Sequence, residues 1–329
     1  MTNKKFKLAA MSLATAVAVS TVGPSASAVT YYLGDGSVTV DKDDNGAFSY
    51  QGEDGSRTYV NEDKAETGDG TIYVQDGHAP TTDNSNNGTE VPTPTDNDTQ
   101  STDASGNNTE NSSTSETTTG NTITVKEDVK DATIVVDGVN VDTSTQTEAL
   151  PDTGSTGDKT IIKVGEGADV DLTVKNSNLT TGGNGIDIGV NLKDDDDNKE
   201  TNVDLTLDNT KVNLTQNGKA GINVQDNSDV NLTLKGENAI DGSKAIENED
   251  LKKNVNVEGI RVGGGGAGDG SGASEGAKTH LTISGGVEKT ETAEADTEET
   301  ESPAGGSLTI SKTTGGLVMA DGSDVEITD

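Results

Sequence analysis

The sequence predicts an all-β protein in which a small β-hairpin module and a disordered linker precede a parallel β-solenoid, or β-helix. A two-strand motif recurs at residues 162–174, 222–234 and 317–328, in the order apolar, any, apolar, three turn residues, small, Asp, Val, any, Leu or Ile, Thr. The chain is only 28% hydrophobic and 2% aromatic, yet its Val, Ile and Leu residues are clustered and periodic. Repetition of this kind indicates stacked structural units.

Residues 1–28 have the three parts of a secretory signal peptide. Three lysines near the start are followed by an apolar run and by Ala26-Ser27-Ala28, a small-residue cleavage site. A membrane anchor is the alternative, but the run is short and interrupted by Ser and Thr. We therefore expect an exported bacterial protein that is extracellular or at the cell surface.

Residues 29–78 are predicted to form the small β module. They hold all five tyrosines of the chain, and Asp-Gly or Asn-Gly dipeptides separate short alternating runs such as residues 37–40 and 71–74. These dipeptides favour tight hairpin turns. The pattern therefore predicts a meander of hairpins.

Residues 79–120 are predicted to be the disordered linker. Ser, Thr, Asn, Asp, Gly and Pro dominate the segment, and it contains no Lys, Arg or aromatic residue. It offers too little apolar surface to offset the entropy lost on ordering. We therefore expect the two flanking regions to move independently.

Residues 121–329 are predicted to form the solenoid. Strands of a first type are expected at residues 123–125, 162–164, 186–188, 222–224, 260–262 and 317–319, and of a second type at 170–174, 203–207, 230–234, 281–283, 308–310 and 325–327. With coils about 4.8 Å apart, Leu172, Leu205 and Leu232 should stack in one core. An immunoglobulin-type β-sandwich is the alternative, but the recurrence of a whole motif favours the solenoid.

The repeated strands also suggest a family. The G-I-x-V strands, as at residues 221–224, and the D-V-x-L-T strands, as at residues 169–173, resemble the repeats of secreted bacterial right-handed β-helix proteins. The resemblance covers roughly residues 121–329 and points to the pectate-lyase-like and adhesin-like surface group. It implies a β-helix fold. Some members of that group bind or cleave acidic polysaccharides, and many are surface adhesins.

The charge of the chain restricts its partners. The formal net charge is −35, and removal of residues 1–28 with three lysines leaves 20 basic against 58 acidic residues, or −38. Such a surface repels phosphate backbones and anionic membranes. Nucleic acid is therefore not an expected partner, and no membrane span is expected once the signal is removed. The absence of cysteine excludes disulfides and thiolate metal sites.

The outward residues of the second-type strands form the candidate binding surface. One predicted column is Asp171, Asp204, Asn231, His280, Ser307 and Glu326, and the other is Thr173, Thr206, Thr233, Thr282, Thr309 and Thr328. A double threonine ladder would suggest ice binding, but the first column is mixed and largely charged. A solvated strand face with β-favouring Thr is the ordinary interpretation. The binding hypothesis centres on the first three members of each column.

Calcium is the one cofactor that the sequence suggests. Consecutive carboxylates, which are hard oxygen ligands suited to Ca²⁺, occur at Asp194, Asp195, Asp196 and Asp197. Consecutive aspartates cannot all face one ion, and such runs are usually solvated. The turn carboxylates Asp169, Asp229 and Asp324 are further candidates, although an Asp in a turn also accepts backbone N–H groups.

A sorting-like motif is formed by Leu150, Pro151, Asp152, Thr153 and Gly154. It is similar to the LPxTG signal that sortases cut between Thr and Gly when they attach proteins to a Gram-positive cell wall. In that family an apolar span and a basic tail follow the motif, whereas the predicted solenoid follows it here. The match is therefore interpreted as coincidental.

These observations predict a non-catalytic, adhesin-like binding protein that engages a glycan or a surface protein. The alternative is a calcium-dependent polysaccharide lyase or hydrolase acting on acidic glycans. With only His78 and His280, no catalytic triad or zinc site can be assembled. A lyase would also need a basic group, and Arg261 is the only arginine in the predicted solenoid. The solenoid has no aromatic residue to support a sugar ring, which counts against a glycan.

The final motif ends inside a second-type strand at residues 325–329, with no polar cap behind it. We expect an open solenoid edge that recruits another strand. Either the sequence is a fragment or another chain covers this end, so self-association at this edge is an expected interaction.

Overall fold

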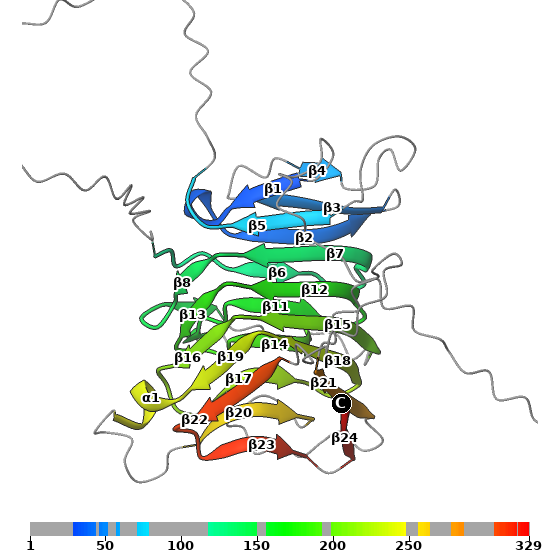
Figure 1. Cartoon of the computed structure of the whole chain (residues 1–329). Coiled ribbons are helices and arrows are strands. Elements are labelled where there is room, and N and C mark those ends of the chain that lie inside the picture. The colour runs from blue at the N-terminus through cyan, green and yellow to red at the C-terminus, as the bar shows by residue number, and fades with distance from the viewer. Residues whose placement is uncertain are drawn as a thin grey trace, which may run out of the picture.

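The computed structural model describes residues 29–43, 46–51, 57–59, 71–78, 118–149, 156–192, 199–247, 256–263, 278–285, 306–320 and 322–328 (Figure 1). Regular structure in these ranges is almost entirely β-strand. The exceptions are the 3-10 turn η1 (Leu33–Asp35) and the short helix α1 (Ser243–Glu247). No helix in these ranges is long and apolar enough to cross a membrane.

Most described strands belong to three sheets, here called A, B and C. Sheet A contains, in spatial order, β1 (Val29–Tyr32), β5 (Thr71–Gln75), β7 (Lys130–Asp137), β12 (Asp169–Lys175), β15 (Thr201–Asp208), β18 (Ser228–Lys235), β21 (Thr279–Gly285) and β24 (Ser323–Thr328). Every neighbouring pair in sheet A is parallel. Sheet A thus extends over the whole described length of the chain.

Sheets B and C run beside it. Sheet B contains β2 (Val38–Asp43), β6 (Ile123–Val125), β11 (Ile162–Gly165), β14 (Ile186–Val190), β17 (Lys219–Val224), β20 (Val257–Val262) and β23 (Gly315–Met319), with β3 (Gly46–Gln51) and β4 (Arg57–Tyr59) beyond β2. Sheet C contains β8 (Asn140–Asp142), β13 (Asn178–Thr181), β16 (Lys211–Leu214), β19 (Glu237–Asp241) and β22 (Ser307–Ser311).

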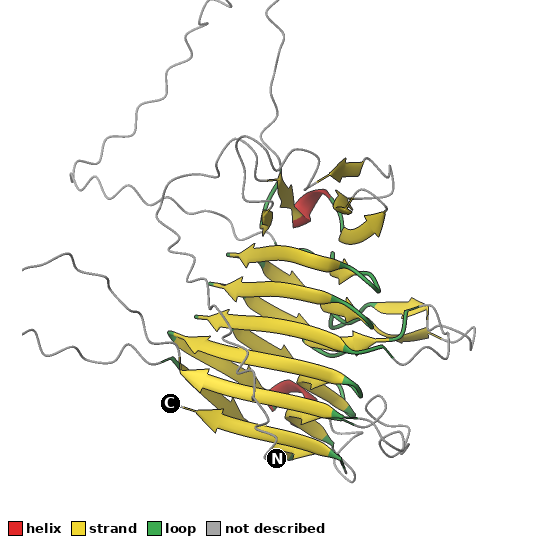
Figure 2. Ribbon diagram, turned by 90° about the vertical axis from the view of Figure 1, so that its right-hand side faces the viewer, coloured by secondary structure: helices red, strands yellow, loops and turns green. Residues whose placement is uncertain are grey.

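The chain visits sheets B, A and C in turn, as in β11, β12 and β13, before it returns to sheet B at β14. One such round is called a coil below, and Figure 2 shows the strands of successive coils one above another. The arrangement is compatible with the predicted parallel β-solenoid. It differs from the antiparallel pairing of an immunoglobulin-type sandwich.

The structure adds a third strand to the two strand types that the sequence predicts. The first type lies in sheet B and most of the second type lies in sheet A. Residues 308–310, predicted as a second-type strand, instead belong to β22, which pairs with β19 in sheet C. That assignment was wrong because an apolar, any, apolar triplet fits a strand of any of the three sheets.

The core consists of aliphatic side chains stacked in register. Leu172, Leu205 and Leu232 are register partners on β12, β15 and β18, and each is 1% exposed. This confirms the predicted stacking. They belong to one hydrophobic cluster that also contains Val38 and Ile72. At about 25 cal/mol per Å² of buried apolar surface, this shared cluster is the main favourable contribution to folding.

The described residues of the predicted small β module share this core and these sheets. β2 pairs in parallel with β6, and β5 pairs in parallel with β7. The predicted hairpin meander is seen only in β2, β3 and β4, which pair antiparallel. The expectation that these residues move independently of the following region is therefore wrong, because shared backbone hydrogen bonds join them. Of the predicted linker, residues 79–117 lie outside the described residues, and Thr119 already bridges to Val141.

The glycine of the G-I-x-V motif is required by packing where sheet C meets sheet B. A Cβ atom on Gly221 would lie 2.6 Å from Cγ2 of Ile240, and one on Gly259 would lie 2.5 Å from Cγ2 of Ile310. Such distances are too short for carbon atoms, so these isoleucines exclude any larger residue. Gly316 holds the equivalent position on β23, where a Cβ atom would have no neighbour within 4 Å.

We expect Gly221→Ala to lower the free energy of unfolding by about 1–3 kcal/mol, the usual cost of overpacking a core. Gly316→Ala is the matched control and should change it by less than about 0.5 kcal/mol. Urea unfolding followed by circular dichroism measures both. Equal losses in the two variants would contradict the packing explanation.

Candidate functional site

The outward face of sheet A carries the predicted binding columns. Asp171, Asp204 and Asn231 are register partners on β12, β15 and β18, and all three are exposed. The structure therefore brings together the three side chains that sequence reasoning grouped.

The threonine column lies beside it on the same three strands. Thr173, Thr206 and Thr233 are also register partners, and each is half-buried. Together the two columns form a polar array whose strand spacing is about 4.8 Å.

The predicted columns are wrong at β21. Asn231 is aligned with Thr282 rather than His280, and Thr233 is aligned with Ser284. His280 instead aligns with Asp229, in a third column. The difference is a shift of two residues along β21, which keeps each side chain on its face and so leaves the alternation pattern unchanged.

Two further residues that were predicted to belong to these outward columns lie on another sheet. Ser307 and Thr309 belong to β22 in sheet C. At the end of sheet A, Glu326 aligns with Thr282 and Thr328 with Ser284, so both columns do reach β24.

Carboxylates crowd one side of the sheet A face. The pKa of Asp171 is raised above its ordinary value, first by partial burial and then by the negative charges of Asp204 and Asp169. Asp204 is stabilised by Asn231, whose Nδ2 donates to its Oδ1 at 2.8 Å. Ionisation of Asp171 is therefore disfavoured on this face.

A neighbouring column of the same face balances its charges. Asp137, Lys175, Asp208 and Lys235 follow one another in register. The Nζ of Lys175 lies 3.2 Å from Oδ2 of Asp137. Opposite charges on adjacent strands stabilise a sheet, so the negative potential is concentrated on the Asp171 and Asp204 side of the face.

The described residues contain only some of the candidate calcium ligands. Asp194, Asp195, Asp196 and Asp197 lie outside the described residues. Asp169, Asp229 and Asp324 lie at or near the starts of β12, β18 and β24, and Asp229 and Asp324 flank His280 in register. Within the part of the chain that the structure describes, no group of three or more His, Asp or Glu side chains could hold a metal ion. Calcium binding stays a prediction.

The sorting-like motif also lies outside the described residues. Leu150, Pro151, Asp152, Thr153 and Gly154 connect β9 (Thr147–Ala149) to β10 (Thr156–Asp158), which pair antiparallel outside the three main sheets.

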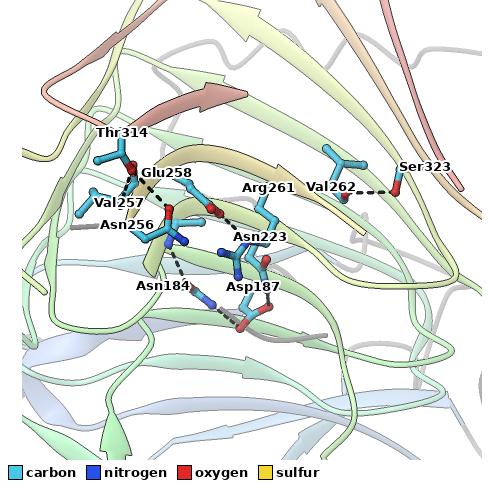
Figure 3. Close-up of polar contacts among 11 residues, drawn as sticks. Asn184, Asp187, Asn223, Asn256, Val257, Glu258, Arg261, Val262, Thr314 and Ser323 are labelled. Carbon is cyan, nitrogen blue, oxygen red and sulfur yellow. Dashed lines mark hydrogen bonds and ion pairs between the residues drawn. The ribbon is translucent and has the colours of Figure 1, made fainter. Parts of the chain in front are cut away.

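A second polar group lies on the outward side of sheet B, yet it is buried. Asp187 on β14 is 8% exposed and accepts hydrogen bonds of 2.8 Å from the side-chain amides of Asn184 and Asn223 (Figure 3). The side-chain amide of Gln225 donates a third, also of 2.8 Å. Burial raises the pKa of Asp187, while these three amides and the positive charge of Lys163 oppose that rise. The carboxylate therefore joins β14 to the next coil at a cost in desolvation.

Arg261 extends this line of side chains. It is the register partner of Asn223, and its Nε donates to Oε2 of Glu258 (Figure 3). Arg261 is 9% exposed and Glu258 is 3% exposed. The basic group considered for a lyase is therefore paired with a buried carboxylate.

Sequence reasoning missed this cluster, although a signal for it exists. Lys163, Asp187, Asn223 and Arg261 all occupy the third position of the repeated first-type strand, the x of G-I-x-V or its equivalent. Their alignment follows from the repeat. The burial of Asp187, Asn223 and Arg261 does not follow from it, because an outward position is normally exposed.

Comparisons of the chain with protein-family models, curated proteins and solved structures found no match. The family resemblance drawn from the repeated strands is therefore carried by those strands alone.

The raised pKa of Asp187 gives a pH-dependent prediction. The folded chain binds a proton at Asp187 more readily than the unfolded chain does, so this group's contribution to the free energy of unfolding falls as pH rises from about 3.8 through the folded pKa. Asp187→Asn should remove this component. The stability difference, wild type minus variant, should therefore decrease with pH in urea unfolding series.

Asp241→Asn is the control, because its stability difference from the wild type should change with pH in the opposite direction. Hydrogen bonds from Ser243 lower the pKa of Asp241, so its stabilising contribution is present above the ordinary carboxyl range and is lost as pH falls through the folded pKa. Its stability difference should increase with pH. A pH-independent difference for Asp187→Asn would refute the account of this carboxylate.

Proposed function

We propose that the protein is an exported, adhesin-like binding protein of a bacterial surface, without catalytic activity, and that the outward face of sheet A binds a glycan or a surface protein. We also propose that its stack of sheets is a right-handed β-helix, as the resemblance of the repeats implies. The observation that carries the proposal is the exposed, in-register array of Asp171, Asp204 and Asn231 beside the threonine column.

The chemistry of this array suits a polar partner. Carboxylate and hydroxyl oxygens accept hydrogen bonds from sugar hydroxyls, from amides and from basic side chains. The side chains stand on paired strands above a packed core, so little backbone entropy is lost on binding. Unbalanced carboxylates around Asp171 also favour a partner with basic groups and steer its approach.

The double variant Asp171→Asn with Asp204→Asn tests the binding face. The control, Asp142→Asn with Glu237→Gln, removes the same charge from β8 and β19 of sheet C. A glycan array and a panel of surface proteins identify the ligand first, and biolayer interferometry then measures affinity. We expect the first pair to weaken binding about tenfold or more, since two polar contacts contribute roughly 1 kcal/mol each, and the control to weaken it far less.

Two results would count against the proposal. Equal weakening by both pairs would assign binding to net charge rather than to this face. Calcium-dependent release of unsaturated product from polygalacturonate by the wild-type protein would favour the lyase alternative instead.

A further inference from the structure

The outward face of sheet A continues from the polar array onto the strands of the predicted small β module. β5 pairs in parallel with β7, and β7 pairs in parallel with β12. In this register Tyr73 aligns with Val135, and Val135 aligns with Thr173. Figure 1 shows β5 above β7, β12 and β15. The threonine column therefore leads to an aromatic side chain on β5.

A second tyrosine lies on the same face. Tyr31 is buried and aligns with the core residue Val74, so the next residue along β1, Tyr32, is on the outward side. Tyr32 and Tyr73 occupy diagonal positions on neighbouring strands, and both are half-buried. Aromatic side chains at diagonal positions of a sheet are within reach of each other. Tyr32 and Tyr73 are called the tyrosine pair here.

The face is also apolar between the tyrosine pair and the polar array. Val135 has an outward position on β7, yet it is only 5% exposed, and it does not belong to the hydrophobic core cluster. Its register partners on the two neighbouring strands are Tyr73 and Thr173. Over three adjacent strands, one outward column thus changes from an aromatic ring to an aliphatic side chain and then to a hydroxyl.

A sugar chain has surfaces that match this change. The C–H groups of a sugar ring form an apolar face that packs against an aromatic ring. Its hydroxyls donate hydrogen bonds to carboxylates and exchange them with the hydroxyls of threonine. The tyrosine pair and the polar array therefore offer both kinds of contact on one face.

The carboxylates restrict the kind of sugar. Asp171 and Asp204 are register partners on adjacent strands, and the chain has 58 acidic against 23 basic residues. A glycan with carboxyl or sulfate groups would be repelled by this surface. A glycan without acidic groups would meet no such repulsion.

We propose that the tyrosine pair and the polar array together bind a glycan that carries no acidic groups, as a chain that crosses the strands of sheet A. One sugar packs on Tyr73, and further units form hydrogen bonds with the columns of Thr173 and Asp171. The inference rests on the proposed function and names its ligand class. Although residues 121–329 contain no aromatic residue, β1 and β5 supply tyrosines to the same sheet.

Affinity electrophoresis tests the class of glycan. Native gels contain hydroxyethylcellulose, mannan, a neutral β-glucan or acidic polygalacturonate, and the protein is the chain that begins at Val29. We expect at least one neutral polysaccharide to retard the protein, and polygalacturonate to leave its mobility unchanged. The neutral polysaccharide that retards it most is the probe for the following measurements.

Variants at Tyr73 test the contribution of the ring. Tyr73→Leu keeps an apolar side chain and should weaken binding of the probe about fivefold to tenfold, whereas Tyr73→Phe keeps the ring and should change it by less than about twofold. Tyr59→Leu, on β4 of sheet B, is the matched control and should bind as the wild type does. Circular dichroism spectra should show that all three variants keep the wild-type fold.

Tyrosine fluorescence provides a second measurement, since the chain has five tyrosines and no tryptophan. Saturation with the probe should change the tyrosine emission of the wild type. Tyr73→Phe should still bind the probe but lose a large part of this change, because the ring that packs on the sugar no longer emits as tyrosine.

The outcomes separate this inference from the function on which it rests. Retardation by no neutral polysaccharide, or by polygalacturonate alone, would overturn it, as would a surface protein as the sole ligand of the face. If Asp171→Asn with Asp204→Asn weakens binding but Tyr73→Leu does not, the role of the tyrosine pair is wrong and the binding face stands. If neither weakens binding, the proposed function fails as well.

Discussion

The register of the inward aliphatic side chains is the constraint on which the rest of the structure depends. Leu172, Leu205 and Leu232 become buried by stacking on one another, because a strand of this length has no core of its own. Side chains alternate along a strand, so the same register fixes every outward position. The exposed columns of sheet A and the buried polar line of sheet B are therefore aligned by the core, and not by contacts among the polar groups.

The fold could be predicted where a strand has several inward aliphatic residues, as β12 and β18 do. Sheet C was missed as a separate sheet because β8 and β13 have one aliphatic residue each, Val141 and Leu179, and so show no measurable period. β2 was assigned to a separate module because a long polar segment separates it from β6. Val38 and Val40 nevertheless have the spacing of a first-type strand, and they align with Ile123 and Val125.

The candidate site was predictable in part for the same reason. Alternation alone identifies Asp171 and Asp204 as outward residues on one face, but it cannot distinguish registers that differ by two residues, which is why His280 was misplaced. The alignment of the Asp187 cluster was predictable from the repeat, but its burial was not. A polar residue at an outward position is the ordinary choice for a solvated face, and the pattern carries no information on the burial that sets its pKa.

The buried Asp187 cluster of sheet B and the exposed columns of sheet A therefore differ in role. The cluster joins neighbouring coils, whereas the exposed columns are available to a partner. Both require strands from residue 71 to residue 328 to share one register. Distances between spin labels on the outward column test this most directly, since pairs of introduced cysteines would be the only ones in the chain. From a label at Tyr73, the distances to labels at Thr173, Thr206 and Thr233 should increase in that order by about 4.8 Å per strand. Distances that do not increase in this order would contradict the account.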